Sequence, residues 1–119
     1  MEEIIQKVSD ILMSGGVIGW FQGSAEFGPR SLGNRSILAN PSVPDIRDKL
    51  NGAIKNREKF RPFALSVLAE CQQDFIGCND FLPFMEQVII PEGKALNQIE
   101  PLLHIDQSVR IQSVRKEDN

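Results

Sequence analysis

The chain has 119 residues, of which 41% are hydrophobic and 24% are charged, and its formal net charge is −3. This composition excludes a disordered tail and predicts a single soluble domain over residues 1–119, with a modest core. No apolar run approaches the roughly 20 residues that span a bilayer, and the acidic start "MEEIIQK" is unlike a signal peptide. We therefore expect a cytoplasmic protein with no membrane partner.

Helical and strand patterns alternate along the chain. Apolar residues at helical spacing predict a helix over 4–12, and a Gly-Gly pair ends it. Short apolar runs predict strands at 17–23 and 36–41, the second ended by Pro41. Ile46, Leu50 and Ile54 predict a second helix, and the later strand candidates are 62–70, 83–90 and 108–116. This order predicts an α/β or α+β fold with a twisted, open, mixed sheet flanked by helices.

The aromatic and sulfur-containing residues are expected to be structural. We expect the aromatic residues to lie in the core, with Phe27 alternatively lining a pocket; they are Trp20, Phe21, Phe27, Phe60 and Phe63. Cys71, Cys78 and the single histidine do not have zinc-site spacing, and two cysteines make no disulfide framework. Both cysteines are predicted to be ordinary thiols, and no metal site is predicted.

Positive charge is concentrated in one window, residues 30–61. This window holds eight of the thirteen basic residues against three acidic ones, a net charge of +5 in an acidic chain. A basic window of this kind favours a small anionic ligand over a long polyanion, which the rest of the surface would repel. A solvated helix face is the alternative interpretation.

The window opens with the loop "EFGPRSLGNRS", residues 26–36. Its glycines permit close backbone approach to an oxyanion, its proline stiffens the chain, and the guanidinium of Arg30 can bind a phosphate or carboxylate with two hydrogen bonds. The spacing matches neither the P-loop nor the dinucleotide fingerprint. A tight surface turn, with Arg30 paired to Glu26, is the alternative. For Arg35, pairing with a nearby acid is the alternative to a ligand contact.

Three motifs in order carry a family resemblance. They are "GWFQGSAEFGPRSLGNRSILANP", "LNGAIKNREKFRPFALSVLAE" and "LLHIDQSVRIQSVRKEDN". Together they resemble the C-terminal domain of the ATP-dependent O-carbamoyltransferases, which include nodulation and antibiotic-tailoring enzymes. The resemblance implies a fold similar to threonylcarbamoyl-adenylate synthase. It also implies that this domain, in a complete enzyme, makes carbamoyl-adenylate from carbamoyl phosphate and ATP, with Mg²⁺ accompanying ATP as substrate, for transfer to a hydroxyl acceptor.

The resemblance also implies a set of site residues. Five cations match the family's substrate-binding positions or the Lys-x-Arg pair of the related synthases, and they are Arg30, Lys55, Arg57, Arg61 and Arg110. Lys55 and Arg61 are the predicted catalytic residues among them. A structural role is expected for His104 and Asp106, with substrate contact as the alternative. Gln107 stands where the family usually has glycine, which would alter the turn before the last strand.

The family pattern continues beyond what this sequence contains. A later strand bearing an Asn-Thr-Ser-Phe-Asn motif and a larger preceding domain have no counterpart here. We therefore expect a partial C-terminal domain that is inactive alone, and an exposed sheet edge would allow a homodimer. The alternatives to an enzyme fragment are a non-catalytic anion- or nucleotide-binding module and, less favoured by the net charge, an RNA-binding domain.

Overall fold

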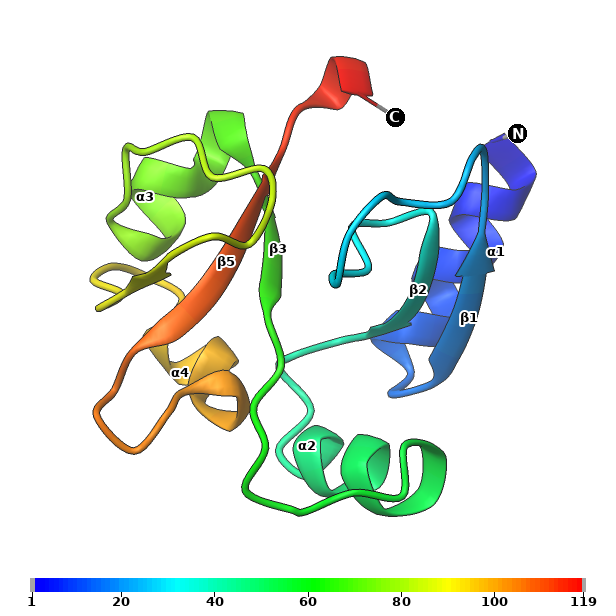
Figure 1. Ribbon diagram of the computed structural model, residues 1–119, viewed down its shortest axis with the longest axis horizontal. Coiled ribbons are helices and arrows are strands. Elements are labelled where there is room, and N and C mark those ends of the chain that lie inside the picture. The colour runs from blue at the N-terminus through cyan, green and yellow to red at the C-terminus, as the bar shows by residue number, and fades with distance from the viewer. Residues whose placement is uncertain (1, 119) are drawn as a thin grey trace.

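A computed structural model describes residues 2–118 and confirms a mixed α/β fold (Figure 1). Within these residues the α-helices are α1 (Glu2–Met13), α2 (Ile46–Lys49), α3 (Gln72–Ile76) and α4 (Leu96–Ile99). The five strands are β1 (Val17–Phe21), β2 (Arg35–Ala39), β3 (Leu65–Leu68), β4 (Val88–Ile89) and β5 (Val109–Val114). None of the helices in this described part is long and apolar enough to cross a bilayer.

The strands form two open sheets. β1 and β2 are antiparallel, with Gly19 opposite Ile37 at the centre of the pair. In the second sheet β5 lies between β3, which runs parallel to it, and β4, which runs antiparallel. Figure 1 shows α1 against the β1–β2 pair on one side of the molecule, the second sheet with α3 and α4 on the other, and α2 at the base between them.

The predicted elements exist, with different bounds. The strand expected at 83–90 is reduced to Val88–Ile89. The helix expected from Ile46 to Ile54 is α-helical only to Lys49 and continues as a π-helical turn, Leu50–Ile54. The short helices α3 and α4 were not predicted, because each has too few residues to display a helical period.

The main core lies on the three-stranded sheet. Its buried members come from β3, β5, α3, α4 and the loops between them, and they are Leu65, Val67, Ile76, Cys78, Leu82, Ala95, Ile99, Leu102, Val109 and Ile111. By contrast, α1 contributes no buried residue, although its apolar stripe has the predicted helical spacing. Cys71 and Cys78 are free thiols, as expected, the first exposed and the second buried.

The expectation that the aromatic residues belong to the core was wrong for three of them. Phe21, Phe27 and Phe60 have exposed fractions of 75%, 107% and 80%. Phe63 packs against the core from a partly buried position. Phe27 lies within the glycine-rich loop, and Phe60 lies in the irregular segment 56–64. Phe21 instead lies under the guanidinium of Arg35, 3.4 Å from its ring centroid.

Candidate functional site: a basic cleft between the two sheets

A cleft of about 610 Å³ opens between β2, the segment that follows α2, and β5. All five predicted site residues line it, and they are Arg30, Lys55, Arg57, Arg61 and Arg110. No aspartate or glutamate is among the described residues that line the cleft. The structure therefore brings together cations that are up to 80 positions apart in the sequence, and their role as ligands stays a prediction.

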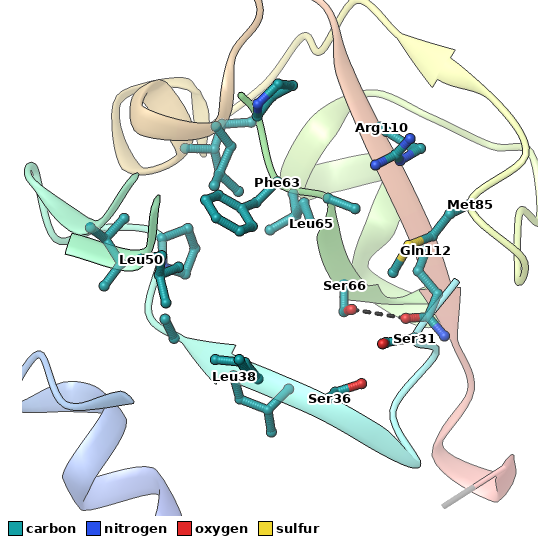
Figure 2. A pocket seen from close by; sticks show the side chains of 18 of the residues that line it. Ser31, Ser36, Leu38, Leu50, Phe63, Leu65, Ser66, Met85, Arg110 and Gln112 are labelled. Atoms are coloured by element: carbon teal, nitrogen blue, oxygen red, sulfur yellow. Dashed lines mark hydrogen bonds between the residues drawn. The ribbon is translucent and has the colours of Figure 1, made fainter. Parts of the chain in front are cut away.

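The cleft has an apolar side and a polar side (Figure 2). Leu38, Leu50, Phe63 and Leu65 line the apolar side. Hydroxyl and amide groups gather toward β5 on the other side, from Ser31, Ser36, Ser66 and Gln112. A cleft of this composition can accept a ligand that has both an anionic group and an apolar or aromatic group.

The glycine-rich loop is folded around a carboxylate. Oε1 of Glu26 accepts hydrogen bonds from the backbone N–H groups of Leu32 (2.7 Å), Asn34 (2.8 Å) and Arg35 (3.1 Å). These bonds lower the pKa of Glu26 from its ordinary value of 4.5 to about 2, with the Leu32 bond as the largest cause. Gly28 and Gly33 adopt φ values of +124° and +114°, which L side chains rarely adopt. Glu26 thus organises the loop through its backbone, and no Arg30–Glu26 ion pair is found between residues 2 and 118.

Arg35 closes the base of this loop. Its guanidinium donates to the backbone carbonyls of Gln22 (2.6 Å), Gly23 (3.0 Å) and Asn34 (2.9 Å). The alternative that Arg35 pairs with a nearby acid finds no ion pair between residues 2 and 118, where Glu26 accepts only the backbone N–H of Arg35. Arg35 therefore holds the loop and does not face the cleft as a ligand group.

Gln112 connects the loop to the second sheet. Its Nε2 donates to the carbonyl of Leu32 (2.8 Å), and its Oε1 accepts from the hydroxyl of Ser66 (3.0 Å), the bond drawn in Figure 2. Because Gln112 is buried and lies two positions after Arg110 on β5, it sets the loop beside Arg110. The sequence contained no signal for this contact, since an isolated glutamine in a strand has no preferred partner.

The remaining cations lie on an irregular segment that follows the π-helical turn. In that turn the Lys55 N–H donates to the Leu50 carbonyl (2.8 Å), and the Arg57 N–H donates to the Asn51 carbonyl (2.8 Å). π-Helical turns occur frequently at functional sites. The guanidinium of Arg57 lies 4.6 Å from the centroid of the Phe63 ring. Exposed Arg61 approaches Glu58 at 3.9 Å, a surface pair that contributes little to stability.

The cations around the cleft repel one another. Burial lowers the pKa of Arg110, and the positive charge of Arg30 lowers it further. Burial also lowers the pKa of Arg57, followed by the charge of Arg61, while Glu58 opposes the shift. In addition, Nε of Arg110 is buried without a hydrogen-bond partner among the described residues. A bound anion would relieve both the repulsion and the unpaired donor.

His104 and Asp106 lie outside this cleft, in the turn before β5. Oδ1 of Asp106 accepts from the N–H (3.0 Å) and the hydroxyl (2.7 Å) of Ser108, and the latter bond is the main cause of its lowered pKa. The His104 N–H donates to the Ser108 carbonyl (2.8 Å). Gln107 has φ of +67°, the left-handed conformation for which glycine is suited. These contacts support the structural interpretation of the turn.

Comparison with known proteins identifies the family. The family model described as "Carbamoyltransferase C-terminus" matches residues 9–119. The chain belongs to this family. Similar proteins include nodulation protein NolO of Bradyrhizobium diazoefficiens, which is 42% identical over 99% of this chain and 22% of its own length. Another is the 3'-hydroxymethylcephem-O-carbamoyltransferase of Amycolatopsis lactamdurans, 37% identical over 95% of this chain and 21% of its own. The chain thus spans about a fifth of the length of these two relatives.

The contacts of Glu26 lead to a prediction for its glutamine variant. A carboxylate whose pKa is lowered in the folded state contributes stability above its unfolded pKa and loses it as pH falls through the folded pKa. We expect Glu26→Gln to lower the melting temperature at pH 7, and the difference from wild type to shrink as pH falls from 4.5 to about 2. Melting curves across this pH range test it. A difference that does not change with pH would contradict the assignment of the three backbone contacts.

Proposed function

We propose that the cleft binds carbamoyl phosphate and ATP and contributes to formation of carbamoyl-adenylate, which a longer enzyme uses to carbamoylate a hydroxyl acceptor. The observation that supports this proposal is the gathering of five cations on one cleft that lacks acidic side chains among its described lining. Two polyanionic substrates repel each other, and fixed cations are the means by which a protein brings them together. Family membership supplies the reaction class.

The reaction would divide the cations into two roles. Water first cleaves the acyl phosphate bond of carbamoyl phosphate, which releases inorganic phosphate and leaves carbamate. A carbamate oxygen then forms a bond to the α-phosphorus of ATP, the bond between that phosphorus and the oxygen bridging to the β-phosphorus breaks, and pyrophosphate leaves. Lys55 and Arg61 would offset the charge that develops on the phosphates and are the proposed catalytic residues. Arg30, Arg57 and Arg110 would hold the substrates, since guanidinium groups match phosphate and carboxylate oxygens bidentately.

Mg²⁺ would enter as part of the nucleotide substrate. The described lining provides hydroxyl, amide and cationic groups and no carboxylate, which is the side chain that binds Mg²⁺ in proteins. The metal would therefore be held through the phosphates of ATP. The proposal assigns no metal-binding residue to this chain.

Binding of carbamoyl phosphate tests the proposal. We expect Arg61→Ala to weaken binding about tenfold, the effect of losing one charge-assisted hydrogen bond. Lys94→Ala removes a lysine that lies outside the cleft lining, and we expect it to change affinity less than twofold. Titration calorimetry on the 119-residue chain measures both. Equal losses in the two variants would sink the assignment of Arg61.

Two further measurements separate the alternative functions. If the domain is a binding module, it would bind carbamoyl phosphate or ATP, but a longer protein that contains it would release no pyrophosphate. An RNA-binding domain would bind RNA with an affinity that falls steeply with salt. The net charge of −3 argues against RNA, because most of the surface would repel it.

A further inference from the structure

We propose that Asn51 is a positioning residue of the cleft, whose side chain holds the segment that carries Lys55, Arg57 and Arg61 in the shape that an anion requires. This inference rests on the function proposed above, because it concerns the same cleft. Asn51 itself does not line the cleft. It would therefore act through the cations and not on the substrate.

The side chain of Asn51 is fully buried and uses both of its polar ends. Its Oδ1 accepts from Nε of Arg57 at 2.7 Å. Its Nδ2 donates to the backbone carbonyls of Lys59 (3.2 Å) and Arg61 (2.8 Å). The exposed fraction of the residue is 0%. One amide thus connects the π-helical turn to three points of the following segment, six, eight and ten positions further along the chain.

The segment depends on the hydrogen bonds from Asn51 because it has no regular backbone hydrogen bonding of its own. Residues 56–64 contain no helix or strand, and most of their side chains are exposed. The segment also carries mutually repelling charges, as the effect of Arg61 on the pKa of Arg57 indicates. A buried amide that binds two backbone carbonyls supplies fixed geometry in a stretch that has no regular backbone hydrogen bonding of its own.

Arg57 is held in an orientation suited to binding. Asn51 accepts a hydrogen bond from Nε of Arg57 only. The Phe63 ring lies under the guanidinium, with its centroid 4.6 Å from the Cζ atom of Arg57. No hydrogen bond from the described residues engages the two terminal nitrogens, which are therefore placed to bind an oxyanion in the paired geometry that guanidinium groups offer. A preorganised cation binds more tightly than a mobile one, since less side-chain entropy is lost on binding.

Gln72 provides a matched control elsewhere in the fold. Its side chain is also buried, at 3% exposure, and it also makes three hydrogen bonds. Nε2 donates to the carbonyls of Cys78 (3.2 Å) and Asp80 (2.7 Å), and Oε1 accepts from the hydroxyl of Ser113 (2.6 Å). Gln72 is absent from the lining of the cleft. Loss of either amide should destabilise the fold, but only Asn51 should influence the cations.

The experiment compares Asn51→Ala with Gln72→Ala in the 119-residue chain. Calorimetry with carbamoyl phosphate, and separately with inorganic phosphate, is expected to give about a tenfold loss of affinity for Asn51→Ala and less than a twofold change for Gln72→Ala. Both variants should melt at lower temperature than wild type. If Asn51→Ala does not fold, Asn51→Ser and Gln72→Ser form the milder pair, with the same order of affinities expected. If the folded Asn51 variant and its Gln72 counterpart bind carbamoyl phosphate with equal affinity, the proposal is wrong.

A spectroscopic readout separates positioning from binding. The Nε–Hε group of Arg57 should exchange slowly with water in wild type, because it donates a hydrogen bond to Oδ1 of Asn51. It should exchange rapidly in the Asn51 variant and remain slow in the Gln72 variant. If wild type binds neither anion, the proposed function fails, and this exchange measurement alone decides the role of Asn51. Slow exchange in the Asn51 variant would then overturn the positioning role.

Discussion

Arg110→Met is expected to weaken binding of carbamoyl phosphate by about 10- to 100-fold, the range for losing a hydrogen-bonded charge from a partly buried site. Arg110 lies on β5, the central strand of its sheet, and is placed by the buried residues on either side of it. Its Nε is buried without a partner among the described residues, and the charge of Arg30 opposes its own. A ligand anion would satisfy both features, so this cation should contribute more to binding than the exposed ones.

The same change should leave the melting temperature unchanged or raise it. In the ligand-free chain Arg110 holds an unpaired donor and a charge that Arg30 repels, and methionine removes both while filling similar space. Opposite effects on affinity and on stability would distinguish a binding residue from a structural one.

Arg115→Met is the matched control for this experiment. Arg115 follows the same strand but lies over the Phe81 ring and outside the cleft lining. We expect Arg115→Met to leave affinity within about twofold of wild type, since no ligand contact is lost. Calorimetry and thermal melting of the two variants provide the test. If both lose affinity equally, or if Arg110→Met only unfolds the chain, the binding role of Arg110 is wrong.

Ile111→Ala is expected to lower the free energy of unfolding by about 2–5 kcal/mol, the range for truncating a fully buried aliphatic side chain. Ile111 is 0% exposed and pairs with Leu65 across the parallel strands β3 and β5. Truncation leaves a cavity in the layer that joins the sheet to α3 and α4, where neighbouring side chains cannot fully relax.

Ile105→Ala is the corresponding control, because Ile105 is 103% exposed in the turn before β5. Its free energy of unfolding should stay within about 0.5 kcal/mol of wild type. Urea titration followed by circular dichroism measures both variants. A loss below about 1 kcal/mol for Ile111→Ala would mean that the core is not centred on β5.

Local patterns in the sequence were sufficient for much of the fold. Helical spacing located α1, apolar runs bounded by glycine or proline located β1 and β2, and alternation located β5. These signals depend on neighbours within a few positions. The exposed side chains of Phe21, Phe27 and Phe60 could not be foreseen in the same way, because burial depends on what the rest of the chain brings over a ring.

The identities of the five cleft cations were determined by the sequence, since charge and residue type are local and the family motifs carry them. Their meeting on one cleft was decided by tertiary structure, in part through the Gln112–Leu32 bond, which sets the loop beside Arg110. The supports of Glu26 and Asn51 were also decided there, because each binds backbone groups six to ten positions away along a chain whose path no periodicity specifies. The sequence determines which chemical groups each residue carries. A hydrogen bond forms only once folding has brought its two groups within about 3 Å of each other.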